Sequence, residues 1–125
     1  MPATKAYSSL IASGTAVAAG TTKASPAGGA LTVNATAAYG GELAYKITNG
    51  GSLGAACTIM FQVSPDGTNW FDYFPVSSSD LASGTVTQGP TVTLSRGSMY
   101  LRAIAYGNTT SACTVEAGVM MVTGL

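Results

Sequence analysis

Alternation of apolar and polar residues is clearest from residue 57 to residue 74, and it predicts a β-hairpin. Apolar residues stand at every second position of the first strand, which gives that strand two distinct faces. These residues are Cys57, Ile59, Phe61 and Val63. Residues 65–69 supply the turn, because Asp66 can hydrogen-bond the backbone ahead of it and Gly67 permits a positive φ. The second strand begins at Trp70.

Aromatic residues are concentrated in this hairpin, which holds five of the ten in the chain. They are Phe61, Trp70, Phe71, Tyr73 and Phe74. Aromatic side chains bury the largest areas, about 150–250 Å² each. We therefore expect the hairpin to nucleate the hydrophobic core.

Shorter alternating segments predict further strands along the rest of the chain. They cover residues 31–33, 42–48, 91–94, 99–106 and 112–123, with an edge strand starting at Val86. In the last segment the inward set is Cys113, Val115, Ala117, Val119 and Met121. Seven or eight short strands, with turn signals between them and no helical period, predict an all-β fold. The predicted fold is an antiparallel β-sandwich with jelly-roll or immunoglobulin-like connections.

The first thirty residues differ in character from the rest and predict two regions. Residues 1–30 are mostly small, with repeated Gly, Ser and Thr, and they cannot form a core alone. We interpret them as an extended N-terminal arm, with one short strand near residues 8–12, and residues 31–125 as the β-sandwich domain. Polar residues interrupt the apolar part of the arm, so its pattern does not predict a signal peptide. The arm residues expected to contact a neighbouring chain are Tyr7, Leu10 and Ile11.

Charge is scarce, and this narrows the classes of partner. Charged residues make up 8% of the chain, against about 25% in a typical domain. The net charge is zero, so neither nucleic acid nor an anionic membrane is an expected partner. A surface with so few charges suggests that partner subunits cover much of it. The alternative is an extracellular protein that Ser and Thr hydroxyls keep soluble.

The residues that support catalysis are also scarce. The chain has no histidine to act as a general base, and it is predicted not to be an enzyme. Asp66 and Asp72 flank one turn, and such a carboxylate pair could serve glycoside hydrolysis. Together with Asn69, the same two residues could instead supply oxygen ligands to calcium. The turn explains Asp66 better, and we predict no metal and no cofactor.

Two cysteines, Cys57 and Cys113, fall on predicted strands with the parity of the core. Two buried cysteines of this kind either face each other as a disulfide or remain free. For a protein assembled in the cytoplasm, free thiols are favoured.

Aromatic residues of the hairpin also permit a different function. Trp70, Phe71 and Tyr73 could line a platform on which a sugar ring stacks, as in a carbohydrate-binding or adhesin module. Burial of the Trp70 indole would argue against this platform, and its exposure on a flat face would favour it.

Residues 63–70 (VSPDGTNW) carry a resemblance to known proteins. They resemble the S-x-D-G-x-x-W hairpin of extracellular β-sandwiches, such as discoidin-like carbohydrate-binding domains and small bacteriophage virion proteins. The Thr/Ala/Gly-rich arm, the strand at 99–106 and the closing segment ending in V-T-G-L make the chain similar to capsid decoration (cement) or head- and tail-associated proteins. This resemblance spans residues 40–125.

The resemblance to phage proteins implies a structural role without catalysis. It implies a homo-oligomer, often a trimer, that binds the major capsid protein or another virion protein. The implied location is the virion, assembled in the host cytoplasm. The resemblance does not distinguish a capsid from a tail position.

Overall fold

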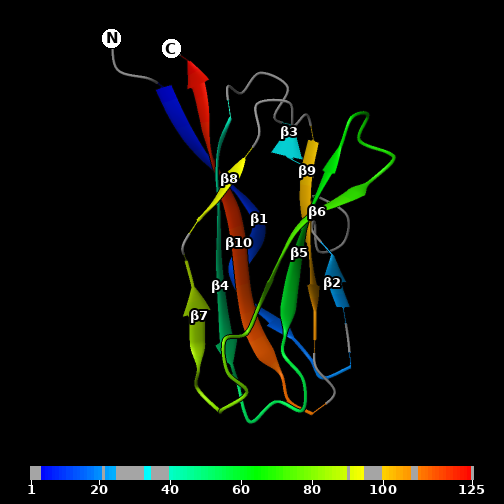
Figure 1. Cartoon of the computed structure of the whole chain (residues 1–125), viewed down its shortest axis with the longest axis vertical. Helices are drawn as coiled ribbons and strands as arrows, with labels where there is room; N and C mark the ends of the chain where they lie inside the picture. The colour runs from blue at the N-terminus through cyan, green and yellow to red at the C-terminus, as the bar shows by residue number, and fades with distance from the viewer. Residues whose placement is uncertain are drawn as a thin grey trace.

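The structure is a computed structural model that describes residues 4–20, 22–24, 33–34, 40–89, 91–94, 100–107 and 110–124. In these ranges the chain forms ten strands, arranged as two antiparallel sheets that pack face to face (Figure 1). The predicted all-β antiparallel sandwich is confirmed. The same ranges contain no helix that is long and apolar enough to cross a membrane.

Each sheet contains five of the strands. Sheet A has the order β1-β10-β4-β7, with β8 also paired to β4. Its strands are β1 (Thr4–Val17), β4 (Gly41–Asn49), β7 (Val86–Gln88), β8 (Val92–Leu94) and β10 (Cys113–Gly124). Sheet B has the order β2-β9-β5-β6, with β3 also paired to β9. Its strands are β2 (Thr22–Ala24), β3 (Val33–Asn34), β5 (Thr58–Ser64), β6 (Phe71–Ser77) and β9 (Tyr100–Tyr106).

Strand pairing is nested around the turn between β5 and β6. Moving outward from that turn, β5 pairs with β6, β4 with β7 and β8, β9 with β2 and β3, and β1 with β10. If β2 with β3 and β7 with β8 are each counted as one interrupted strand, eight strands remain in two sheets of four. This is the order of a jelly roll, in which one long hairpin is rolled up so that its strands alternate between the sheets. Of the two predicted connection patterns, the strand order fits the jelly roll.

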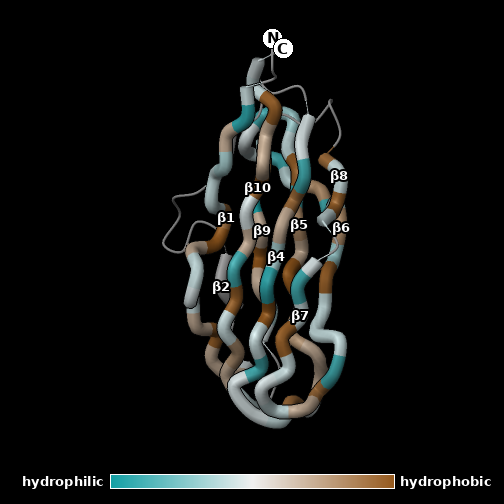
Figure 2. The backbone as a smooth tube through the Cα atoms, turned by 90° about the vertical axis from the view of Figure 1, so that its left-hand side faces the viewer, coloured by the Kyte–Doolittle hydropathy of each residue, from teal (hydrophilic) through white to brown (hydrophobic). Residues whose placement is uncertain are grey.

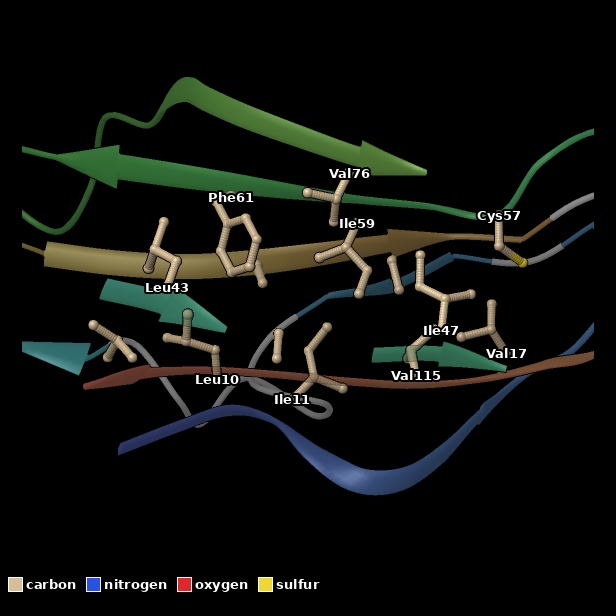
Figure 3. Packing of buried hydrophobic residues seen from close by; sticks show 14 of the residues in the cluster. Leu10, Ile11, Val17, Leu43, Ile47, Cys57, Ile59, Phe61, Val76 and Val115 are labelled. Atoms are coloured by element: carbon tan, nitrogen blue, oxygen red, sulfur yellow. The ribbon is translucent and has the colours of Figure 1, made fainter. Parts of the chain in front are cut away.

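The core lies between the sheets and follows the predicted alternation in most strands (Figure 3). All five residues predicted to face inward on β10 are buried. On β4 the buried apolar residues are Leu43 and Ile47, and on β5 they are Ile59 and Phe61. On β9 the residues that face the core are small apart from Leu101, so the outward-facing side carries the bulkier residues. Alternation therefore located the core side of β5 and β10 correctly, whereas for β9 the sequence left both faces open.

Aromatic residues contribute less to the core than the sequence predicts. Phe61 is the only aromatic side chain among the buried residues that the structure describes. Phe71 and Phe74 are exposed, because they stand on β6, an edge strand of sheet B. Of the hairpin aromatics, Phe61 lies in the core and Tyr73 packs against it, and most of the buried cluster is aliphatic.

The predicted N-terminal arm is instead a strand over residues 4–17. β1 pairs with β10 and forms an edge of sheet A, so the division between an arm at 1–30 and a separate sandwich is wrong for this segment. The register slips between Ser9 and Ile11 and again between Ile11 and Thr15. Such bulges add residues to one strand, bend it and increase its twist. They also hid the strand, because they break the regular alternation of apolar and polar residues.

Candidate interaction surfaces

The tip of the β5–β6 hairpin is held by side chains that bond to its own backbone. The buried Ser64 hydroxyl accepts hydrogen bonds from the amides of Asp66 and Gly67, at 3.2 and 2.8 Å. The Asp66 Oδ1 atom accepts from the amides of Thr68 and Asn69, both at 2.8 Å. The Asp66 Oδ2 atom accepts from the Asn69 side-chain amide at 2.7 Å. Gly67 has a φ of 78°, which a residue with a side chain rarely adopts.

These contacts fix the role of the Asp66 carboxylate. The amides of Asn69 and then Thr68 lower the pKa of Asp66 well below its usual range, because they favour the charged form. Both of its oxygens take part in the turn, and Asp72 accepts a hydrogen bond from Gln62 at 2.8 Å. Among the described residues, no three acidic, histidine or cysteine side chains gather closely enough to hold a metal ion. Asp66 and Gly67 therefore shape the turn, as the sequence predicts.

Trp70 belongs to a short row of polar contacts across the outer face of sheet B. The Arg102 guanidinium lies over the Trp70 ring, 4.3 Å from its centre. Its Nε atom donates to Gln62 Oε1 at 2.7 Å, and Gln62 in turn donates to Asp72. Trp70 is half-buried, and the cation occupies a face of its ring. Such an indole is a poor stacking surface for a sugar.

Tyr73 does not share a platform with Trp70. The β5–β6 register slips between Phe61 and Gln62, which leaves Tyr73 as the extra residue of a bulge. Its ring packs against the core cluster, and its hydroxyl donates to the backbone oxygen of Thr93 in β8 at 2.8 Å. Tyr73 thus links the two sheets, and the platform expected from Trp70, Phe71 and Tyr73 is not formed as one surface.

Phe71 and Phe74 form an exposed aromatic edge on β6, here called the β6 edge. Phe71 is 60% exposed and Phe74 is 42% exposed. They pair with Val63 and Phe61, so they share the core-facing side of sheet B, since opposite residues point to the same face. Their strand is the last of the sheet, and both side chains remain exposed there. The sequence missed this surface because the alternation gives the face of a residue and not its distance from the sheet edge.

The three residues predicted as contacts of the N-terminal arm are separated by the fold. Leu10 and Ile11 are both buried in the core of this chain, so they cannot contact a neighbouring chain as expected (Figure 3). The bulge at this point explains how two consecutive residues can face inward. Tyr7 remains 55% exposed on the outer face of sheet A.

Cys57 and Cys113 are joined by a disulfide, which corrects the expectation of free thiols. Cys57 stands just before β5 in sheet B, and Cys113 begins β10 in sheet A. Both side chains are buried between the sheets, so they face each other across the sandwich. The bond connects the two sheets at one end of the molecule.

Fold and surfaces together define a jelly-roll sandwich with an aromatic edge and few charges. No protein-family model matches the chain, and no curated protein matches it. Its function must therefore be inferred from its own surfaces.

Proposed function

We propose that the chain is a non-enzymatic structural subunit of a virus particle, a decoration or cement protein that binds the capsid as a homo-oligomer. The observation that carries the proposal is the exposed β6 edge, with Phe71 and Phe74, in a chain that is only 8% charged. Aromatic side chains, phenylalanine included, are enriched in the cores of protein–protein interfaces.

The fold supports the same proposal by analogy. Jelly rolls occur in viral capsid proteins and also in lectins and cupins. A fold alone does not define a function, so the surface has to choose among these classes. The chain has no histidine, the side chain on which acid–base and metal chemistry most often depend. The structural role fits the remaining features best.

The β6 edge is the contact that we propose between copies of the chain. It takes the place of the contact predicted for Leu10 and Ile11, which lie in the core. Burying two phenylalanine rings against another copy would remove apolar surface from water, and the rings carry no charge that would have to be desolvated. The partner at this edge is another copy of the chain, and the capsid would bind elsewhere on the oligomer.

Size-exclusion chromatography with light scattering tests the self-association. At micromolar concentration the chain is expected to form a discrete homo-oligomer. The double variant Phe71→Ser/Phe74→Ser is expected to be a folded monomer with the circular dichroism spectrum of the wild type, because both rings are outside the core, and its melting temperature should no longer depend on protein concentration. The control is Leu81→Ser, which changes another exposed apolar residue and should leave the oligomer intact. A monomeric wild-type chain would overturn this part of the proposal.

Co-sedimentation tests the binding to particles. Purified chain is mixed with capsids of the virus that encodes it, and the pellet is analysed by mass spectrometry. Saturable binding at a fixed ratio to the capsid protein is the expected result. A chain that stays in the supernatant at every ratio would overturn the virion role, even if the chain is oligomeric.

A further inference from the structure

The outer face of sheet A carries a depression of about 320 Å³ near the middle of the sheet. Figure 2 looks onto this sheet, with β1, β10, β4 and β7 side by side. Ala44 on β4 is a small residue of this lining, and its pair on β10 is Gly118, over which the Tyr7 ring lies. The residues that line it come from four strands, namely Tyr7, Ala44, Tyr45, Lys46, Gln88 and Glu116. We call this site the Tyr7 depression.

Tyr7 forms a fixed aromatic wall of the Tyr7 depression. Its phenol lies against the backbone of Gly118, at the place where any Cβ atom would overlap the ring. Tyr7 is nevertheless 55% exposed, so part of the residue remains accessible to a ligand. Burial, and secondly the negative charge of Glu116, raise the pKa of Tyr7, which keeps the phenol neutral and able to donate a hydrogen bond.

Three polar side chains form a row beside this wall. Glu116 on β10 is paired with Lys46 on β4, and Lys46 is paired with Gln88 on β7. Paired residues point to the same face, so all three project from the outer side of the sheet. A carboxylate only accepts hydrogen bonds, an ammonium group only donates them, and an amide does both. One positive and one negative charge give the row no net charge.

We propose that the Tyr7 depression binds a neutral sugar ring, which stacks on Tyr7 and hydrogen-bonds to Glu116, Lys46 and Gln88. Adjacent hydroxyls of a sugar both donate and accept, so one can donate to Glu116 while its neighbour accepts from Lys46. The apolar C–H face of the ring would cover the tyrosine. A charged ligand is less suitable, because an anion would be repelled by Glu116 and a cation by Lys46.

The sugar site and the proposed oligomer use different parts of the molecule. The Tyr7 depression lies on sheet A, whereas the β6 edge belongs to sheet B. The sugar site therefore does not depend on the virion role, and the experiments on each can fail separately. A structural protein with such a site could attach to glycans. Glycan binding would then be an activity in addition to the proposed structural role.

NMR titration of the ¹⁵N-labelled chain tests the proposal, with glucose, galactose, mannose and N-acetylglucosamine as probes at millimolar concentration. At least one sugar is expected to shift the amide signals of Tyr7, Lys46 and Gly118 in a saturable way. Tyr7→Ala should weaken binding about tenfold through loss of the stacking surface. Gly118→Ala retains the tyrosine but displaces its ring, and it should weaken binding similarly.

Control variants separate the site from general effects on the fold. Tyr106→Ala removes another exposed tyrosine, from sheet B, and should leave binding unchanged. Glu116→Gln keeps the shape of the row and removes one acceptor, so it should weaken binding without unfolding the chain. Absence of saturable shifts with all four sugars would overturn the proposal. Shifts centred on the Trp70 indole would also overturn it, and would place sugar binding on sheet B.

Discussion

Asp66 shows how one side chain can determine a turn. Its carboxylate accepts hydrogen bonds from two backbone amides and one side-chain amide, all within the three residues that follow it. Ser64 supports the same turn from the other side, through its buried hydroxyl. The Ser, Asp and Gly of the S-x-D-G-x-x-W motif, together with Asn69, thus form one hydrogen-bond network within the turn.

The lowered pKa of Asp66 predicts how the stability of the protein depends on pH. Because the pKa is lower in the folded state, the stabilisation is fully present above the unfolded value of roughly 4 and is lost as the pH falls below it. Asp66→Asn should therefore lower the melting temperature at neutral pH, and the difference from wild type should shrink as the pH falls below about 4. Thermal unfolding followed by circular dichroism measures both. A difference that is the same at neutral and acidic pH would contradict this role.

At the scale of the element, β1 is an irregular edge strand of sheet A that still contributes to the core. Its bulges carry Leu10 and Ile11 into the core, and Gly14, with a φ of 79°, lies in the second irregular stretch. Irregular edges also discourage pairing with another chain, because a twisted strand presents no flat row of free amides. β1 thus closes sheet A and protects its edge.

The burial of Leu10 leads to a prediction about stability. Leu10→Ala should lower the free energy of unfolding by about 2–5 kcal/mol, because it removes buried methyl groups and leaves a cavity. Ala16→Ser, an exposed change on the same strand, should have an effect within about 0.5 kcal/mol. Urea denaturation measures both values. A small effect of Leu10→Ala would show that β1 is a detachable arm, as the sequence alone suggests.

Elements with strict alternation could be predicted from the sequence, and irregular ones could not. The core sides of β5 and β10 follow directly from the period of two, whereas β9 has apolar residues on both faces, so its period does not identify the core side. β1 was predicted only as a short strand near residues 8–12, because its bulges shift that period. The Tyr7 depression was missed for a different reason: Tyr7, Ala44 and Glu116 are far apart in the chain and meet only through the strand register. Local patterns contain no information about which strands become neighbours.

At the scale of the whole molecule, the disulfide holds the two sheets together. It closes a loop between residues separated by 56 positions in the sequence. Among the described residues, the two sheets contact each other mainly through the packing of apolar side chains (Figure 3). The hydrogen bond from the Tyr73 hydroxyl to Thr93 adds a polar contact between them. A covalent link at one end therefore limits how far the layers can separate.

Loss of the disulfide should weaken the fold markedly. The double variant Cys57→Ser/Cys113→Ser is expected to lower the free energy of unfolding by about 2–5 kcal/mol, chiefly because the unfolded chain gains freedom. Reduction of the wild-type chain should likewise lower its melting temperature, whereas the reductant should not change the melting temperature of the variant. Equal melting temperatures with and without reductant would contradict a structural role of the bond.

The nested pairing of the jelly roll has a consequence for the order in which the chain folds. Gln62 and Asp72 are ten residues apart and meet at the tip, while Thr4 and Gly124, near opposite ends of the chain, meet at the rim (Figure 1). Closing the tip first brings β4 and β7 within reach, and each later pairing then closes only a short effective loop. Folding should therefore proceed as a zipper from the Asp66 turn outward. The N- and C-terminal strands would join last and separate first when the protein is stressed.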